Sequence, residues 1–290
     1  MRKSSLVLLT SAIIGLLLVS GFNRPATAAN SVTPQYITGT DFKMLDTTKL
    51  PSPVITDEKE TKIYLDKLVT EAYEVWLKEK DVAAVNDFYR ENNCIVLTPE
   101  KAEVYGEVSS NNTDVTMGTP TVVYEMYSGN YIISATMQWN KSGSTPKWMN
   151  DFTGGAGDAE VVGLSLGNGA SSSFTNKGYL MFTEDKNDVN TGTITNAQDW
   201  DNSGVIFRPQ DVFLSDINGQ NKNYNIDGYY ISLYVKYNGP AVGVPIFSQY
   251  GHSWTKTAIG SWGFSTGGVS ISYVDSNYAW KASSGPKYFN

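Results

Sequence analysis

The only histidine of the chain, His252, lies in the stretch SQYGHSWTKT, two residues before Trp254. Histidine titrates near neutral pH and often serves as a general base. A serine hydrolase would need His252 for that role, but the fold expected below is not that of an α/β hydrolase. Catalytic zinc usually needs at least two histidines. We therefore assign no catalytic residue. We expect His252 to pack on a strand, or to contact a ligand at a binding surface with Trp254.

Paired carboxylates are the second chemistry to consider. A glycosidase needs only two carboxyl groups about 5–10 Å apart across a cleft. Glu125 interrupts the apolar stretch TVVYEMY, and Glu160 opens the stretch EVVGLSL. A glutamate in such a strand is either a tuned acid or a solvated charge at the strand edge. The sequence leaves open whether Glu125 and Glu160 share a cleft.

A possible calcium site is the third. In the stretch DWDNSGVIF, Asp199, Asp201 and Ser203 alternate before Gly204. This resembles the first half of an EF-hand loop, in which alternate oxygens converge on the ion. The closing position holds Gln210 instead of glutamate, and no flanking helices are expected. The stretch predicts either a structural calcium ion held by Asp199, Asp201 and Ser203 or an Asx-rich turn. We expect no other cofactor.

A row of aromatic side chains is the best clue to binding. The chain has 18 tyrosines and 7 tryptophans. In YYISLYVKY, Tyr230 and Tyr234 lie on one side of the predicted strand with Ser232 between them, while Tyr229 and Ile231 point to the other side. Exposed aromatic rows give rigid contact area, and on β-sandwiches they suit stacking on sugar rings. The alternative is that a second sheet or a helical segment covers this face.

The elements that must position these residues change character near residue 95. Between Asp57 and Asn92, 16 of 36 residues are charged, whereas 23 of the 26 glycines follow Asn92. Helical spacing of Leu65, Val69 and Ala72 predicts a helix, and Asp81 can cap a second one. We expect the apolar stripes to pack on the host domain; a partner-binding or self-associating helix pair is the alternative.

After residue 100 the apolar period becomes two, which is typical of antiparallel sheets. Gly129-Asn130 and Gly267-Gly268 lie between alternating runs and suit tight hairpins. About ten short strands without intervening helices predict a mainly β fold, an antiparallel β-sandwich of jelly-roll type preceded by a short helical segment. The predicted divisions are a signal peptide at 1–28, an extended arm at 29–56, a helical segment at 57–95 and the sandwich at 96–290.

The first residues predict export. Arg2 and Lys3 precede an uncharged apolar run over residues 6–19, and Ala26-Thr27-Ala28 offers a cleavage site. The run is too short for a transmembrane helix, so we expect a secreted, extracellular protein without a membrane span. Cleavage would remove three basic residues and no acidic one, taking the formal net charge from −7 to −10. So acidic a chain disfavours nucleic acid as a partner.

The chain contains one cysteine, Cys94, so it forms no internal disulfide, and we expect a buried thiol rather than a reactive one. Four stretches carry a resemblance to a known group: ISATMQWN, GDAEVVGLSLGNG, SGVIFRPQD and YGHSWTKTAIGSWGFSTGGVSISYVDSNYAWKASSG. Across residues 120–285 the chain resembles an uncharacterised family of secreted proteins from Bacillus-type Gram-positive bacteria. The resemblance implies secretion and a β-rich body and carries over no functional residue.

These observations lead to three hypotheses of function. The first is a secreted, non-enzymatic β-sandwich that binds an extracellular glycan or cell-wall surface through Tyr230, Tyr234, His252 and Trp254. The second is a secreted glycosidase-like enzyme that uses paired carboxylates such as Glu125 and Glu160. The third is a secreted toxin or antagonism factor that inserts or oligomerises, because its strands are rich in serine, threonine and glycine.

Overall fold

The protein is described here from a computed structural model. The structure describes residues 45, 47–97, 106–108, 114–142, 145–146, 157–167, 170–211, 213–215, 222–239, 244–254, 257–265, 268–274, 279–284 and 287–289. The predicted signal peptide and most of the predicted extended arm lie outside these residues. The described part of the arm contains a 3-10 turn at Thr47–Lys49. All described residues belong to one compact unit, Pro34–Asn290.

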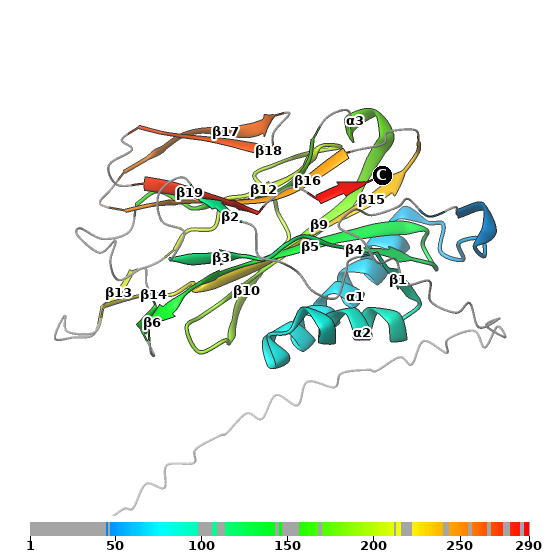
Figure 1. Ribbon diagram of the computed structural model, residues 1–290, viewed down its shortest axis with the longest axis horizontal. Helices are drawn as coiled ribbons and strands as arrows, with labels where there is room; N and C mark the ends of the chain where they lie inside the picture. Colours follow the sequence, from blue (N-terminus) through cyan, green and yellow to red (C-terminus); the bar gives the residue numbers. More distant parts are fainter. Residues whose placement is uncertain are drawn as a thin grey trace, which may run out of the picture. The chain divides into compact units, whose positions relative to one another are not determined.

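Two antiparallel sheets of seven strands form the body of the fold (Figure 1). The first has the order β1-β4-β5-β15-β9-β10, with β3 also paired to β5, and the second has the order β11-β12-β8-β16-β19-β2, with β20 also paired to β16. The first contains β1 (Cys94–Val96), β3 (Val115–Met117), β4 (Thr121–Glu125), β5 (Asn130–Trp139), β9 (Phe174–Glu184), β10 (Asn190–Ile194) and β15 (Gly228–Tyr237). The second contains β2 (Gly106–Val108), β8 (Val161–Leu166), β11 (Asp199–Asp201), β12 (Gly204–Phe207), β16 (Val244–Ser253), β19 (Ala279–Ser284) and β20 (Lys287–Phe289).

Three two-stranded ribbons and a short helix complete the β part. The ribbons pair β6 (Lys141–Ser142) with β7 (Thr145–Pro146), β13 (Phe213–Ser215) with β14 (Lys222–Tyr224), and β17 (Ile259–Ser265) with β18 (Gly268–Tyr273). The short helix is α3 (Ala170–Ser173). The predicted antiparallel β-sandwich is confirmed, and its jelly-roll type stays a prediction.

The alternation read from the sequence gives the correct faces. Tyr229 and Ile231 of β15 point between the two sheets, where they join the main apolar core. Tyr230 and Tyr234 point to the outer face of the first sheet, where they join a second core. A strand with a two-residue period must divide its side chains in this way. Unlike a sheet with one solvated side, however, this sheet is buried on both faces.

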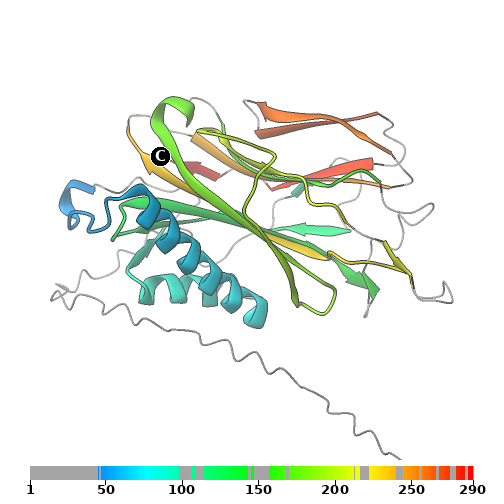
Figure 2. The same cartoon turned by 180° about the vertical axis from the view of Figure 1, so that it is seen from behind.

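Helices cover that outer face. α1 (Glu58–Glu79) and α2 (Val82–Glu91) lie against the first sheet, and Figure 2 shows α1 running alongside β9. The predicted stripe of Leu65, Val69 and Ala72 is buried in the second core, which confirms its packing on the host domain. Asp81 caps α2 as predicted, with its Oδ1 accepting from Ala83 N at 2.9 Å.

Charged side chains fasten both ends of α1. Near its start, Lys177 donates to Glu58 at 2.6 Å. Just after its end, Lys80 donates to Glu184 of β9 at 2.6 Å, and the Glu184 side chain is almost fully buried. Gln138 of β5 donates to the other oxygen of Glu184 at 2.7 Å. We call α1 and α2 with these contacts the helical cover.

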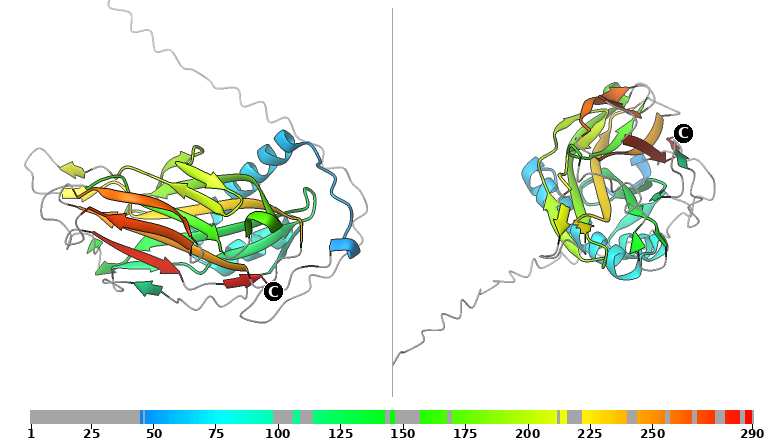
Figure 3. Two further views of the ribbon diagram at one scale, coloured as in Figure 1. Left: turned by 90° about the horizontal axis from the view of Figure 1, so that it is seen from above. Right: turned by 90° about the vertical axis from the view of Figure 1, so that its left-hand side faces the viewer.

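A ribbon covers the opposite face. The β17–β18 ribbon lies over the outer side of the second sheet, and Figure 3 shows it from above. Val269 and Ile271 pack there with Ile259, Val161 and Ile206 in a third apolar core. We call this the ribbon cover. The fold therefore has four layers: helices, sheet, sheet and ribbon. No helix among the described residues is both long and apolar enough to span a bilayer.

Candidate functional site

His252 forms a buried pair with Glu160. The register of β8 and β16 places Val161 opposite Gly251, so that Glu160 and His252, the next residues along, come together. His252 Nδ1 lies 2.8 Å from Glu160 Oε1, and each residue is 1% exposed. We call these two residues the Glu160–His252 pair. The sequence could not reveal this partner, because it lies 92 positions away.

Aromatic rings and an arginine enclose the pair. The His252 ring lies 5.0 Å from the Trp139 ring and 5.6 Å from the half-buried Trp254. Arg208 Nε and Nη2 donate to the carbonyl oxygen of Ala159 at 3.1 and 2.7 Å, and so fix the backbone beside Glu160. Burial and the Glu160 carboxylate raise the pKa of the nearby Tyr250 hydroxyl. This enclosure makes the pair a polar element of the core and leaves Trp254 at its solvent side.

Glu125 serves a different purpose at the β4–β5 turn. Its carboxylate accepts from Tyr127 N and Ser128 N at 2.7 Å each, and from Ser128 Oγ at 2.5 Å. Tyr64 of α1 also donates to it, at 3.3 Å. Burial raises the pKa of Glu125, and the donors offset that rise only in part. The carboxylate therefore closes the turn and joins it to α1.

Glu125 and Glu160, whose relative position the sequence leaves open, lie far apart. Glu125 lies opposite Asn130, the first residue of β5, whereas the Glu160–His252 pair packs on Trp139, the last. Nine residues of strand separate these two points, which is about 30 Å. Two carboxyl groups of a glycosidase must lie about 5–10 Å apart. These two do not share a cleft.

The expected exposed row of tyrosines is also wrong. Tyr230 is 3% exposed and Tyr234 is fully buried, because the helical cover lies over both. Tyr73 of α1 packs its ring 5.6 Å from the ring of Tyr230. The alternative, that the helical segment covers this face, is confirmed. Tyr230 and Tyr234 thus bind the protein's own helices, and burial raises the pKa of each.

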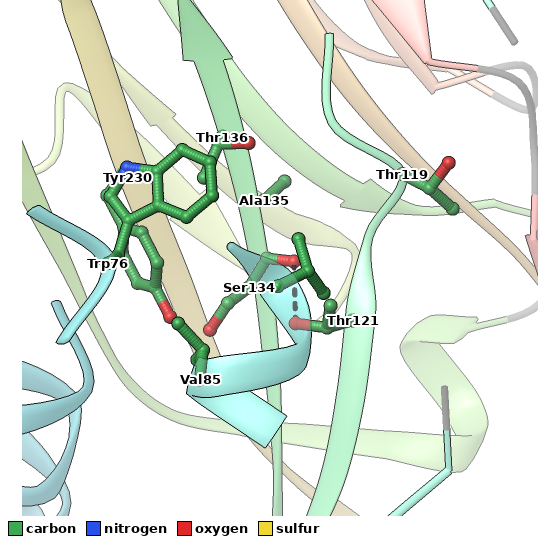
Figure 4. A pocket seen from close by; sticks show the side chains of 9 residues that line it. Trp76, Val85, Thr119, Thr121, Ser134, Ala135, Thr136 and Tyr230 are labelled. Atoms are coloured by element: carbon green, nitrogen blue, oxygen red, sulfur yellow. Dashed lines mark hydrogen bonds between the residues drawn. The ribbon is translucent and has the colours of Figure 1, made fainter. Parts of the chain in front are cut away.

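A small cavity remains beside Tyr230 (Figure 4). Its volume is about 20 Å³, and its polar lining includes Thr121, Ser134 and Thr136 from the sheet. Thr121 Oγ1 donates to the Ser134 carbonyl at 3.3 Å. A cavity of this size and polarity has room for one water molecule. This cavity is too small for a sugar ring, so it is not a glycan-binding site.

The predicted calcium residues form a tight hairpin between β11 and β12. Asp199 and Asp201 are exposed, and Asp201 Oδ1 accepts from Ser203 N at 2.5 Å. This contact is that of an Asx turn, the alternative named above. Within the described residues, no group of three or more histidine, cysteine, aspartate or glutamate side chains is arranged to hold a metal ion. The calcium ion stays a prediction.

Serine chemistry has two sequence matches that the structure explains. The strings GLSLG at residues 163–167 and GFSTG at residues 263–267 both fit G-x-S-x-G. A nucleophile elbow needs a sharp turn from a strand into a helix. Ser165 instead lies buried within β8, and Ser265 ends β17 with its hydroxyl donating to the Gly268 carbonyl at 2.8 Å. Neither string forms an elbow.

An exposed tryptophan at one edge of the sandwich is the feature that the sequence reasoning missed. Among the described residues, the most exposed large apolar side chains are those of Val54, Ile63, Val189, Trp200 and Val274. Trp200, the aromatic one, is 55% exposed. It belongs to β11, where the flanking Asp199 and Asp201 also fit the start of a calcium loop. The signal in the sequence is the alternation in DWD, where a tryptophan between two aspartates indicates a strand at the surface.

The position of Trp200 gives it a rigid base. It lies opposite Val205 of β12, which is buried between the sheets, so Trp200 extends the inner face into solvent. Its ring lies 5.9 Å from the ring of Tyr179, which in turn packs edge-on against Phe207. Asn176 Nδ2 donates to the Asp201 carbonyl at 3.0 Å and ties β9 to β11. We call Trp200, Tyr179 and Asn176 the Trp200 edge.

Comparisons with known proteins add no assignment. No model of a known protein family matches the chain, and a search of curated proteins found no match.

Proposed function

We propose that the protein is a secreted, non-enzymatic β-sandwich that binds an extracellular glycan or a cell-wall surface through the Trp200 edge. The observation that carries this proposal is the exposed ring of Trp200, supported from behind by Tyr179. An aromatic face held by a strand offers flat apolar area at little entropic cost, which suits the apolar face of a sugar ring. Secretion follows from the predicted signal peptide at residues 1–28.

The polar contacts around the hairpin fix the strand that carries the ring. Asn202 Oδ1 accepts from Asn176 N at 3.0 Å, and Asn176 Nδ2 donates to the Asp201 carbonyl at 3.0 Å. Because these amides bond the protein's own backbone, the contact offered to a sugar is the ring itself, which suits stacking. Trp254 and His252 contribute less to this proposal, since His252 is enclosed.

Retention on isolated cell walls and on a glycan array tests the proposal. The mature chain should be retained, and Trp200→Ala should weaken retention about tenfold or more, equal to about 1.4 kcal/mol. Trp200→Phe should keep most of it. Val189→Ala is the matched control, because Val189 is also a mostly exposed apolar residue, at 56%. Blank arrays with no cell-wall retention, or full binding by Trp200→Ala, would contradict the proposal.

The same assay tests the predicted calcium ion, because Asp199 and Asp201 flank Trp200 in β11. A bound ion would order this hairpin and the ring within it. Chelation should then weaken retention, and added calcium should restore it. Retention that ignores both treatments would remove calcium from the proposal without affecting the role of Trp200.

A further inference from the structure

The ribbon cover is a separate sheet with a smooth outer side. Among the described strands, β17 and β18 pair only with each other. On the side away from the body, Ser261 lies opposite Ser272 with their hydroxyls 2.7 Å apart, and Gly263 lies opposite Ser270. Ser265, at the end of β17, is also exposed. The outer side therefore consists of small, neutral residues.

The ribbon also carries no charge. The sequence has no charged residue from Thr257 to Val274, although the whole chain has a formal net charge of −7. Two copies that approach through most of their surfaces repel each other. When two copies approach ribbon to ribbon, no charged residues of the two ribbons face each other, so this repulsion is smallest there.

The outer strand of the ribbon lacks two of the usual protections of an edge, namely charge and short length. β18 packs on β8 and β16, and β17 forms the outer strand (Figure 1). β17 has seven residues with no proline and no charge. Exposed edges of this kind are templates for pairing, and proteins normally blunt them by short length, charge or bulges.

Other outer strands of the described fold do show these protections. β11 has three residues, two of them aspartates. β10 has an irregularity between Asn190 and Gly192. β1 has three residues and follows directly from the helical cover. β17 also has an irregularity, between Ile259 and Ser261, but it is longer than β1 and β11, and its residues 261–265 pair regularly and carry no charge.

We infer that β17 is a self-association edge at which a second copy of this chain adds its own β17 in antiparallel pairing. A two-fold axis presents the same strand to itself, so complementarity needs no second partner surface. The product is a ribbon of four strands in the order β18-β17-β17-β18. This inference is independent of the proposed function, and would give an assembly with two Trp200 edges.

The size of the contact sets its strength. A strand of seven residues is about 23 Å long. Pairing two such strands covers less than the ~1,200–2,000 Å² of a typical stable interface. We therefore expect a weak, concentration-dependent dimer with a Kd in the range of about 10 μM to 1 mM.

Sedimentation velocity across that concentration range tests the inference. The wild type should shift from monomer toward dimer. The double variant Ser261→Lys, Ser265→Lys should remain monomeric, because pairing would bring four ammonium groups together. Both serines are exposed, so the apolar side of the ribbon is untouched. The matched control, Thr193→Lys with Thr195→Lys, adds the same charge at exposed positions in and after β10 and should associate like the wild type.

A second measurement locates the contact. Cys94 is buried and burial raises its pKa, so a single introduced thiol is the reactive one. Under mild oxidation, Ser261→Cys, Gly263→Cys and Ser265→Cys should give unequal amounts of disulfide dimer, highest nearest the two-fold axis. Thr193→Cys should give little. The inference is overturned if the wild type stays monomeric at the highest concentration, or if both lysine variants associate like the wild type. In either case, β17 does not pair with a second copy of this chain.

Discussion

The two covers hold the same kind of sheet face by opposite means. The helical cover inserts large side chains such as Leu65 and Tyr73 into the second core and adds the buried Lys80–Glu184 contact. The ribbon cover instead approaches closely over glycines: a Cβ at Gly163 would lie 2.5 Å from Val269, and one at Gly204 would lie 2.9 Å from Phe264. The helical cover therefore depends on large side chains that fill the second core. The ribbon cover depends on glycines, whose lack of a side chain lets the ribbon approach the sheet.

This difference predicts opposite sensitivities to side-chain size. The largest effect should come from removing volume under the helical cover. Leu65 is fully buried, so Leu65→Ala should lower the free energy of unfolding by about 2–5 kcal/mol. Ile63→Ala, at a position 61% exposed on the same helix, should change it by less than about 0.5 kcal/mol. Chemical denaturation measures both, and equal losses would contradict the assignment of faces.

Adding volume should disturb the ribbon cover next most strongly. Gly163→Val should lower the free energy of unfolding by about 1–3 kcal/mol, because the new methyl groups meet Val269. The ribbon should also become accessible to chymotrypsin at Trp262 and Phe264. Gly263→Val is the control, since a Cβ there has nothing within 4 Å. If Gly163→Val leaves both stability and proteolysis unchanged, the ribbon is not seated on this glycine.

The charged contact of the helical cover should have a smaller effect. Lys80→Met leaves the carboxylate of Glu184 buried with Gln138 as its remaining side-chain donor, and should cost about 1–2 kcal/mol. Lys78→Met removes a solvent-exposed pair with Glu79 on the same helix and should leave the Tm nearly unchanged. Thermal denaturation of the two variants side by side distinguishes the buried contact from the exposed one. Equal shifts in Tm would show that Glu184 does not depend on Lys80.

The smallest effect should be a pH dependence of stability that arises from Glu125, which joins the β4–β5 turn to α1. Burial raises the pKa of Glu125, so the folded state holds this proton more tightly than the unfolded state. The resulting stability is fully present below the usual glutamate pKa of about 4.3 and is lost as pH rises through the folded value. The free energy of unfolding of the wild type, minus that of Glu125→Gln, should therefore fall with rising pH. Glu74→Gln, the same substitution at an exposed position, is the matched control.

Local pattern was sufficient to predict the elements and their faces. The alternation in β15 separates Tyr229 and Ile231 from Tyr230 and Tyr234 as predicted, and the stripe of Leu65, Val69 and Ala72 is buried. Each of these features follows from a period of two or 3.6 residues within one segment. Such periods report on the segment itself, and they need no knowledge of distant parts of the chain.

What lies against each face could not be read in this way. Tyr230 and Tyr234 were placed on the correct side of β15, but the helix that buries them precedes that strand by some 150 residues in the sequence. Glu160 meets His252 only through the register of β8 with β16. DWD fits the start of a metal loop as well as it fits a strand, so the sequence alone does not single out Trp200. Contacts between distant segments decided each of these outcomes.

The places of β15 and β16 in the chain have a consequence for how the molecule is built. β15 joins β5 to β9 in the first sheet, and β16 joins β8 to β19 in the second. Both strands lie in the last quarter of the sequence. The hairpins formed by earlier segments are therefore not joined into sheets until β15 and β16 pair with them. Pairing over such distances is slow, because loop closure comes before any gain. We expect the hairpins to form early and the assembled body to appear late, in a single concerted step.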